Sequence, residues 1–179
     1  MAARCPACKV AAPGPEALQR GVTAATTLAL ELPDEAATRA LAADLAQRAR
    51  RGDVIGLSGP LGSGKTTFAR AFIAARIGVD EVPSPTFTLV EVYESLTGPA
   101  LWHFDLYRLE KPEDAYELGL EDAFADGISL IEWPERLGGL MPREHLGVTL
   151  LPGARETERL ARLDASPSWT TRIVGLSRG

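Results

Sequence analysis

The stretch Gly59-Pro-Leu-Gly-Ser-Gly-Lys-Thr-Thr67 contains the residue types that can hold a phosphate chain. It matches the spacing G-x-x-x-x-G-K-[ST], in which a glycine-rich loop directs successive backbone N–H groups at phosphate oxygens. Gly62 and Gly64 permit the unusual φ angles and the close backbone approach that such a loop needs. The Lys65 ammonium can bridge the β- and γ-phosphates, and the Thr66 hydroxyl can reach Mg²⁺. The motif therefore predicts a nucleotide phosphate site.

The residues on either side of this loop decide whether the match is meaningful, because similar glycine-rich patterns also arise by chance. Residues 53–58 form a short, mostly apolar run that predicts a buried strand before the loop. After the loop, apolar residues recur at helical spacing until Gly78, which suits a helix C-terminus. A strand, a loop and a helix in this order are the context that phosphate binding requires.

Two carboxylates follow predicted strands and could act on the same phosphates. Glu132 follows the apolar run 128–131, and Asp105 ends the run 100–104. Carboxylates at the carboxyl ends of strands beside a phosphate loop hold Mg²⁺ or orient water in nucleotide hydrolysis. The alternative for each is a structural pair with a nearby arginine.

The loop 82–88, Val-Pro-Ser-Pro-Thr-Phe-Thr, has two interpretations. Its prolines stiffen a segment that carries the hydroxyls of Ser84, Thr86 and Thr88. Such a loop can sense the γ-phosphate or its Mg²⁺ and order only around a triphosphate. It can equally be a rigid proline turn that leads into a strand.

Three further side chains lie close to the two carboxylates in sequence. His103 could share the strand face of Asp105, where a packed, hydrogen-bonded histidine is expected rather than a general base. Trp133 is either a packing residue or a lid near the nucleotide. Arg108 places a guanidinium either near phosphate or next to Asp105 as a structural pair.

The elements that must position these residues alternate between strands and helices. The patterns predict strands at 26–32, 53–58, 87–93, 100–106 and 128–131, a helix from Asp34 to about Ala49, short helices within 112–125, and a hairpin of 148–151 with 160–163. We therefore expect an α/β protein with the three-layer P-loop NTPase fold and a central mixed, mainly parallel sheet.

The length of 179 residues predicts one domain, which we place at residues 21–165. Residues 1–20 are rich in Ala, Pro and Gly without periodicity and predict a disordered extension. Residues 166–179 show little pattern and are expected to be a C-terminal tail. No stretch approaches the ~20 apolar residues of a membrane span, and no hydrophobic signal core is present, so a cytoplasmic protein is favoured.

Composition limits the possible partners. The net charge of −5 and a pI near 5.1 give no basic surface for nucleic acid, so a partner is expected to hold any RNA. Cys5 and Cys8 could be half of a zinc site or a redox pair. Two thiols on a mobile tail are favoured, because the other zinc ligands, His103 and His145, lie far along the chain.

Five segments, taken in order, resemble the TsaE (YjeE) family: Leu61-Gly-Ser-Gly-Lys-Thr-Thr-Phe68, Ser84-Pro-Thr-Phe-Thr-Leu89, His103-Phe-Asp-Leu-Tyr-Arg108, Glu117-Leu-Gly-Leu120 and Ile131-Glu-Trp-Pro-Glu135. The resemblance covers about residues 25–165. Many families share the phosphate loop, but the second and third segments together with the Glu-Trp pair are specific. Ser63 departs from the alanine common in the family, which leaves the backbone N–H donors intact.

This resemblance implies a weak, Mg²⁺-dependent and partner-stimulated ATPase that supports threonylcarbamoyladenosine (t6A) modification of tRNA. The implied partner is the TsaB–TsaD transferase complex, through which tRNA is contacted, and the implied cofactors are ATP and Mg²⁺. Carried over by position, Thr66 and Glu132 hold Mg²⁺, while Asp105, Thr86 and Lys65 serve hydrolysis. The residues implied in nucleotide binding are Pro33, Leu61, Gly62, Ser63, Gly64, Lys65, Thr66 and Thr67.

Three other functions could use a phosphate loop. A GTPase is excluded because the chain has no Asn for a guanine-selecting Asn-Lys-x-Asp motif. A small P-loop kinase could use Asp105 as a base toward a substrate hydroxyl, although no Arg-rich lid segment is present. A nucleotide-dependent binding module without obligatory hydrolysis is the remaining alternative.

Overall fold

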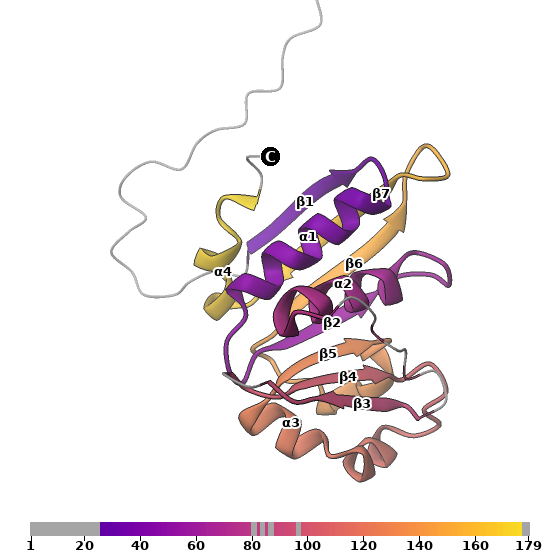
Figure 1. The fold of residues 1–179 in the computed structure, drawn as a ribbon. Helices are drawn as coiled ribbons and strands as arrows, with labels where there is room; N and C mark the ends of the chain where they lie inside the picture. Colours follow the sequence, from indigo (N-terminus) through magenta and orange to yellow (C-terminus); the bar gives the residue numbers. More distant parts are fainter. Residues whose placement is uncertain (1–25, 80–81, 83–84, 86–87, 96–97, 177–179) are drawn as a thin grey trace, which may run out of the picture.

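The structure, a computed structural model, describes residues 26–79, 82, 85, 88–95 and 98–176. Cys5, Cys8, Ser84 and Thr86 lie outside these described residues. Figure 1 shows the elements in chain order. They are β1 (Thr26–Leu32), α1 (Glu35–Arg48), β2 (Val54–Ser58), α2 (Lys65–Ile77), β3 (Val90–Tyr93), β4 (Leu101–Asp105), the 3₁₀ helix η2 (Pro112–Leu118), α3 (Leu120–Asp126), β5 (Ile128–Glu132), the 3₁₀ helix η3 (Pro134–Leu140), β6 (Leu146–Pro152), β7 (Arg159–Ala165) and α4 (Pro167–Ile173).

All seven strands join one sheet in the order β1-β7-β6-β2-β5-β4-β3. The four central strands, β6, β2, β5 and β4, run parallel to one another. Antiparallel pairing adds β7 and β1 at one side and β3 at the other. The predicted mixed sheet with a parallel centre is confirmed, and so is the β6–β7 hairpin, in which Leu151 pairs with Leu160.

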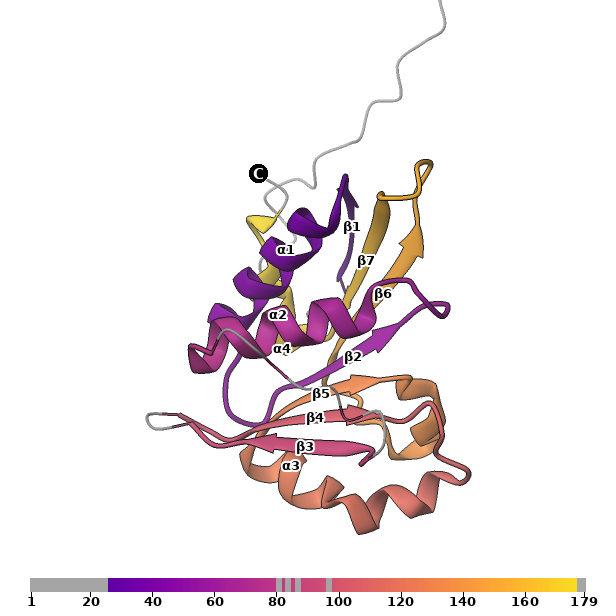
Figure 2. The ribbon, with the colours of Figure 1, turned by 45° about the vertical axis from the view of Figure 1, so that its right-hand side comes forward.

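Helices cover both faces of the sheet, as the expected three layers require. Figures 1 and 2 show α1 and α2 side by side on one face and α3 on the other. Buried side chains form one cluster beneath α1 and α2, which includes Leu45 and Phe72. A second cluster lies between the sheet and η2, α3 and η3, and includes Phe104 and Ile131. Burial on both faces explains why the central strands are continuous apolar runs.

Two helix starts confirm the sequence signals near the phosphate loop. The Asp34 carboxylate accepts the Ala37 N–H at 2.8 Å and caps α1. Helix α2 begins at Lys65 directly after Gly64, whose φ is 101°, and ends before Gly78 in the left-handed conformation. Lys65 and Thr66 therefore occupy the first turn of α2, where the backbone N–H groups have no partner within the helix.

The region after residue 165 differs from the expected tail. Residues Pro167–Ile173 form α4, and Trp169 and Ile173 are buried in the same cluster as α1. The Arg172 guanidinium lies 3.9 Å from the centre of the Trp169 ring. The folded part of the chain thus extends past the boundary placed at residue 165. No described helix is both long and apolar enough to cross a bilayer.

Candidate functional site

The loop between β2 and α2 depends on glycine for two different reasons. At Gly59, a β-carbon would lie 2.2 Å from the backbone oxygen of Leu150, so the loop packs directly against β6. At Gly62 and Gly64, a β-carbon would meet nothing within 4 Å, but their φ angles of 75° and 101° favour glycine. The loop is therefore anchored at its start and open along its later part.

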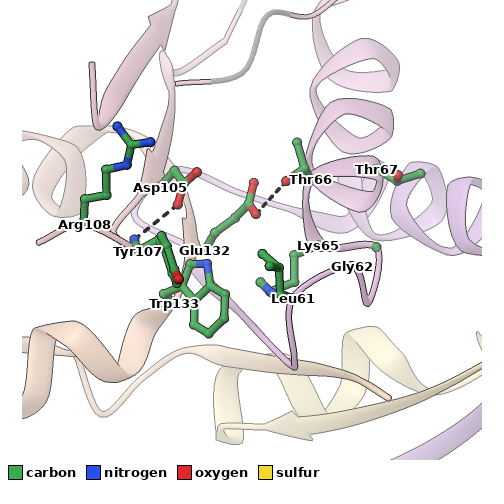
Figure 3. A pocket seen from close by; sticks show the side chains of 11 residues that line it. Leu61, Gly62, Lys65, Thr66, Thr67, Asp105, Tyr107, Arg108, Glu132 and Trp133 are labelled. Atoms are coloured by element: carbon green, nitrogen blue, oxygen red, sulfur yellow. Dashed lines mark hydrogen bonds between the residues drawn. The ribbon is translucent and has the colours of Figure 1, made fainter. Parts of the chain in front are cut away.

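A cavity of about 440 Å³ lies beside the open part of this loop (Figure 3). Its walls come from the loop, the first turn of α2 and the ends of β4 and β5. The lining residues are Leu61, Gly62, Gly64, Lys65, Thr66, Thr67, Asp105, Tyr107, Arg108, Glu132 and Trp133.

Most of the site residues predicted from the sequence line this single cavity. Ser63 instead lines a neighbouring cavity, together with Gly62 and Gly64. Pro33 lines a third cavity, formed with the β6–β7 turn. Thr86 lies outside the described residues, so its place relative to the cavity stays a prediction.

Strand register brings the two carboxylates together. Asp105 pairs with Glu132 across the parallel strands β4 and β5, and Leu57 of β2 pairs with Glu132 on the other side. The phosphate loop follows β2 directly, so all three strands end at the same edge of the sheet.

Glu132 is the most enclosed acid in the cavity, with 2% of its surface exposed. Its Oε2 accepts the Thr66 hydroxyl at 2.9 Å, and its Oε1 lies 3.0 Å from Nε2 of His103. In the described part of the chain, Glu132 therefore bonds to a hydroxyl and an imidazole and not to an arginine. His103 is the packed, hydrogen-bonded histidine that the sequence favoured.

Lys65 is buried at the base of the loop. Its Nζ donates to the carbonyl oxygens of Gly59 at 2.8 Å and Pro60 at 3.0 Å. Burial lowers the pKa of Lys65, while the carboxylates of Glu132, Glu135 and Asp105 raise it. Phosphate oxygens are stronger acceptors for an ammonium than carbonyls are, so this amine can exchange its loop contacts for an anionic ligand.

Trp133 packs against the second core cluster, as one of its two interpretations expects, and it also lines the cavity. Its role as a lid near a nucleotide stays a prediction. Its backbone is left-handed, with φ 61° and ψ 51°. The centre of the indole ring lies 3.9 Å from Nζ of Lys65. The centroids of the Trp133 and Tyr107 rings are 5.0 Å apart. A cation–π contact of this kind holds the ammonium at the cavity surface.

Asp105 is half-buried and accepts the Tyr107 N–H at 3.2 Å (Figure 3). Burial raises the pKa of Asp105, and the neighbouring Glu132 raises it further. The Tyr107 N–H, His103 and Lys65 oppose this shift. A carboxylate with a raised pKa is a better proton acceptor than an exposed one.

The second cavity, of about 700 Å³, was not foreseen from the sequence. It lies between the phosphate loop, the N-terminus of α1 and the β6–β7 turn. Arg159 links two of these walls, because its Nε donates to Ser63 O at 3.1 Å and its Nη1 donates to Glu156 O at 2.6 Å. These contacts join segments nearly a hundred residues apart, so no local sequence signal could reveal them.

Comparison with known proteins matches residues 32–161 to the family model for the threonylcarbamoyl adenosine biosynthesis protein TsaE. The chain is 35% identical over 157 residues to the tRNA threonylcarbamoyladenosine biosynthesis protein TsaE of Rickettsia felis, covering 80% of this chain and 91% of that protein. It is 39% identical over 120 residues to the Bacillus subtilis protein of the same name, covering 66% and 72% respectively.

The crystal structure of Bacillus subtilis YdiB superimposes with a TM-score of 0.71 at 29% sequence identity. The match covers 87% of this chain and 97% of that one. The fold is accordingly of the P-loop NTPase type, and the family takes part in t6A biosynthesis on tRNA. Because the family model matches 130 of its 179 residues, this chain belongs to the TsaE family.

Proposed function

We propose that this protein binds ATP with Mg²⁺, hydrolyses it slowly, and thereby supports turnover of a TsaB–TsaD transferase complex during t6A modification. The observation that carries the proposal is one cavity that holds Lys65, Thr66, Asp105 and Glu132. Family membership supplies the pathway. The arrangement of the four side chains supports the ATPase chemistry.

The donors present fit a magnesium nucleotide. The Thr66 hydroxyl and the Glu132 carboxylate lie 2.9 Å apart, and Mg²⁺ prefers oxygen ligands. Among the described residues, no cluster of three or more His, Cys, Asp or Glu side chains could hold a metal ion. Mg²⁺ suits such a site because it keeps several waters and shares its remaining positions with substrate phosphates.

Residues of this chain can bind the phosphates and position the attacking water. The loop N–H groups and Lys65 neutralise and orient the phosphate chain, while Thr66 and Glu132 supply the two protein oxygens for the cation. Mg²⁺ held by Thr66 and Glu132 would offset the negative charge of the phosphates. Asp105 orients the attacking water and accepts its proton, and Trp133 shields Lys65 from solvent.

We expect slow hydrolysis by the isolated protein from the cavity lining. Arg108 is the single arginine among the lining residues that the structure describes, and it already has an interaction within the chain. Efficient phosphoryl transfer to water uses an arginine that contacts the transferring phosphoryl group, often supplied by a partner. We therefore expect the transferase complex to accelerate hydrolysis.

The test combines nucleotide binding with turnover. ATP, ADP and GTP are titrated into purified protein with and without Mg²⁺, and phosphate release is measured with and without the TsaB–TsaD complex. The proposal expects uptake of ATP and ADP, slow release alone, and at least about tenfold faster release with the complex. No nucleotide uptake, or equal rates in both conditions, would overturn it.

The matched variant Glu132→Ala separates hydrolysis from binding. We expect it to retain nucleotide through the loop but to lose hydrolysis and multiple-turnover t6A formation. If this variant sustains t6A formation over many cycles, the protein is a nucleotide-dependent binding module. Transfer of phosphate to an added hydroxyl acceptor would instead identify a kinase.

A further inference from the structure

His103 is a fully buried polar residue of the site whose side chain the proposed chemistry does not use. It lies on β4, two residues before Asp105. Strand side chains alternate between faces, so His103 and Asp105 point to the same face of the sheet. Leu101, on this face, packs in the cluster beneath α1 and α2, whereas Phe104 packs on the opposite side. His103 therefore lies buried on the same face of the sheet as Asp105, where it contacts Glu132 of the cavity.

The contact between His103 and Glu132 has a defined direction. Nε2 of His103 lies 3.0 Å from Oε1 of Glu132. An ionised carboxylate can only accept hydrogen bonds, so Nε2 must carry the proton and donate it. The other carboxylate oxygen, Oε2, receives the Thr66 hydroxyl at 2.9 Å. Each of the two oxygens of Glu132 thus has its own partner.

Packing alone does not account for an imidazole at this position. Nδ1 of His103 is buried and has no hydrogen-bond partner among the described residues. A buried polar atom without a partner is destabilising, and an apolar side chain of similar size would fill the same space without that penalty. The useful contribution of the ring is therefore the bond that Nε2 makes to Glu132.

We propose that His103 is a positioning residue that holds Oε1 of Glu132 so that Oε2 faces the cation beside Thr66. This inference rests on the proposed Mg²⁺-nucleotide function. A glutamate side chain has several rotatable bonds, and an unpinned carboxylate samples orientations that do not bind the cation. A rigid imidazole fixed in a strand removes that freedom before the ligand arrives. Side chains that orient metal ligands in this way change metal affinity by about 10- to 100-fold.

Two substitutions distinguish positioning from packing. His103→Gln retains an N–H donor that can reach Oε1, whereas His103→Leu fills the space without a donor. The measurement is the affinity for a non-hydrolysable ATP analogue in EDTA and across a Mg²⁺ titration. We expect His103→Leu to bind the analogue as the native protein does in EDTA, but to need about 10- to 100-fold more Mg²⁺ for half-maximal enhancement. His103→Gln should stay within about threefold of the native Mg²⁺ requirement, because its donor replaces the one that orients the ligand.

A measurement on the unmodified chain covers the case in which His103→Leu does not fold. The sequence has only two histidines, so the His145→Gln variant assigns both sets of ring resonances in a ¹⁵N-histidine NMR spectrum. The inference expects the His103 proton on Nε2, shielded from solvent, both with and without Mg²⁺ and the analogue. A proton on Nδ1 with Nε2 bare would overturn it.

The Mg²⁺ titration separates failure of the proposed function from failure of the positioning role. If the native protein gains no affinity from Mg²⁺, the proposed function fails, and with it the role of His103. If the native protein responds to Mg²⁺ and His103→Leu responds identically, only the positioning role is overturned. Equal loss of affinity in EDTA and in Mg²⁺ for both variants would show a purely structural role and would also overturn it.

Discussion

Gly59 fixes the start of the phosphate loop by contact with β6, and a side chain there has no space. Its φ of 136° lies where other residues rarely occur, and a β-carbon would collide with Leu150 O. We expect Gly59→Ala to lower the free energy of unfolding by about 3 kcal/mol or more, from strain and overpacking together. Urea unfolding measures this loss.

Gly78→Ala is the matched control, because Gly78 also has a positive φ but a β-carbon there meets nothing within 4 Å. Left-handed strain alone should cost about 1–2 kcal/mol. If both variants lose the same stability, the contact with Leu150 does not fix the loop.

Asp105 illustrates a conflict between stability and activity. Burial raises its pKa, so the folded protein holds this proton more tightly than the unfolded chain does. The resulting stabilisation is present in acid and is lost as the pH rises through the raised pKa, which leaves a poorly solvated carboxylate at neutral pH. Asp105→Asn removes that carboxylate and can still accept the Tyr107 N–H.

We therefore expect Asp105→Asn to raise the melting temperature at pH 7 by about 1–3 °C, as a change below 1 kcal/mol does in a domain of this size. The gain should disappear as the pH falls through the raised pKa of Asp105, because the native side chain then also becomes neutral. At pH 7, hydrolysis should fall by about 100-fold or more, because the proton acceptor is lost. Lower stability at pH 7 would contradict this account of Asp105.

At the residue level, the sequence predicted the site residues that belong to local motifs. It did not predict the contact that depends on how two strands pair. Lys65 and Thr66 belong to a contiguous motif, and Asp105 and Glu132 each end an apolar run, so their convergence follows from parallel strand ends. The contact between His103 and Glu132 requires β4 and β5 to be neighbours in one register. That pairing joins segments 29 residues apart, which no local pattern encodes.

At the scale of elements, α4 is held to the start of β2 by an enclosed ion pair. Nη2 of Arg172 donates to Oδ1 of Asp53 at 2.9 Å, and the two side chains are only 9% and 11% exposed. Arg172→Met would leave the Asp53 carboxylate enclosed without its cation. We expect the free energy of unfolding to fall by about 2–4 kcal/mol in urea denaturation.

The pair of Arg162 with Asp164 provides the comparison, because these side chains are 55% and 43% exposed. Arg162→Met should change stability by no more than about 0.5–1 kcal/mol, since exposed ion pairs contribute little. Equal losses for the two arginine variants would show that enclosure does not strengthen the α4 anchor.

The central strands were confirmed because they are continuous apolar runs, and the two long helices because their ends carry local signals, Asp34 before α1 and Gly78 after α2. Helix α4 escaped notice because it is a single short segment with two buried apolar residues, Trp169 and Ile173, four positions apart. Such a helix owes its stability to tertiary packing and not to propensity. Strand order was not predictable either, because inserting β7 between β1 and β6 depends on contacts that only the folded chain makes.

At the scale of the whole molecule, the phosphate loop follows β2, the central strand of the sheet. Strands β1, β7 and β6 form the first half on one side of β2, and β5, β4 and β3 form the second half on the other. β2 pairs with β6 on one side and with β5 on the other. Arg159 of β7 contacts the loop from the first half, and Glu132 of β5 contacts Thr66 from the second. A ligand held by this loop therefore stabilises contacts of both halves, and unfolding of either half must release it.

This arrangement predicts one cooperative thermal shift on ligand binding. At a Mg²⁺–ADP concentration 100 times its Kd, binding to the folded state alone adds about 2.7 kcal/mol. In a domain of this size, that corresponds to a melting temperature higher by about 5–10 °C. Calorimetry should show a single transition that moves as a whole, because the domain unfolds as one unit.

Lys65→Ala supplies the control for this shift, since it removes the phosphate contact but leaves the sheet intact. It should retain the melting temperature of the ligand-free protein within a few degrees and lose most of the ligand-induced increase. Two separate transitions, with only one of them moved by the ligand, would contradict a site shared by both halves. A full shift in Lys65→Ala would show that the ligand binds away from the phosphate loop.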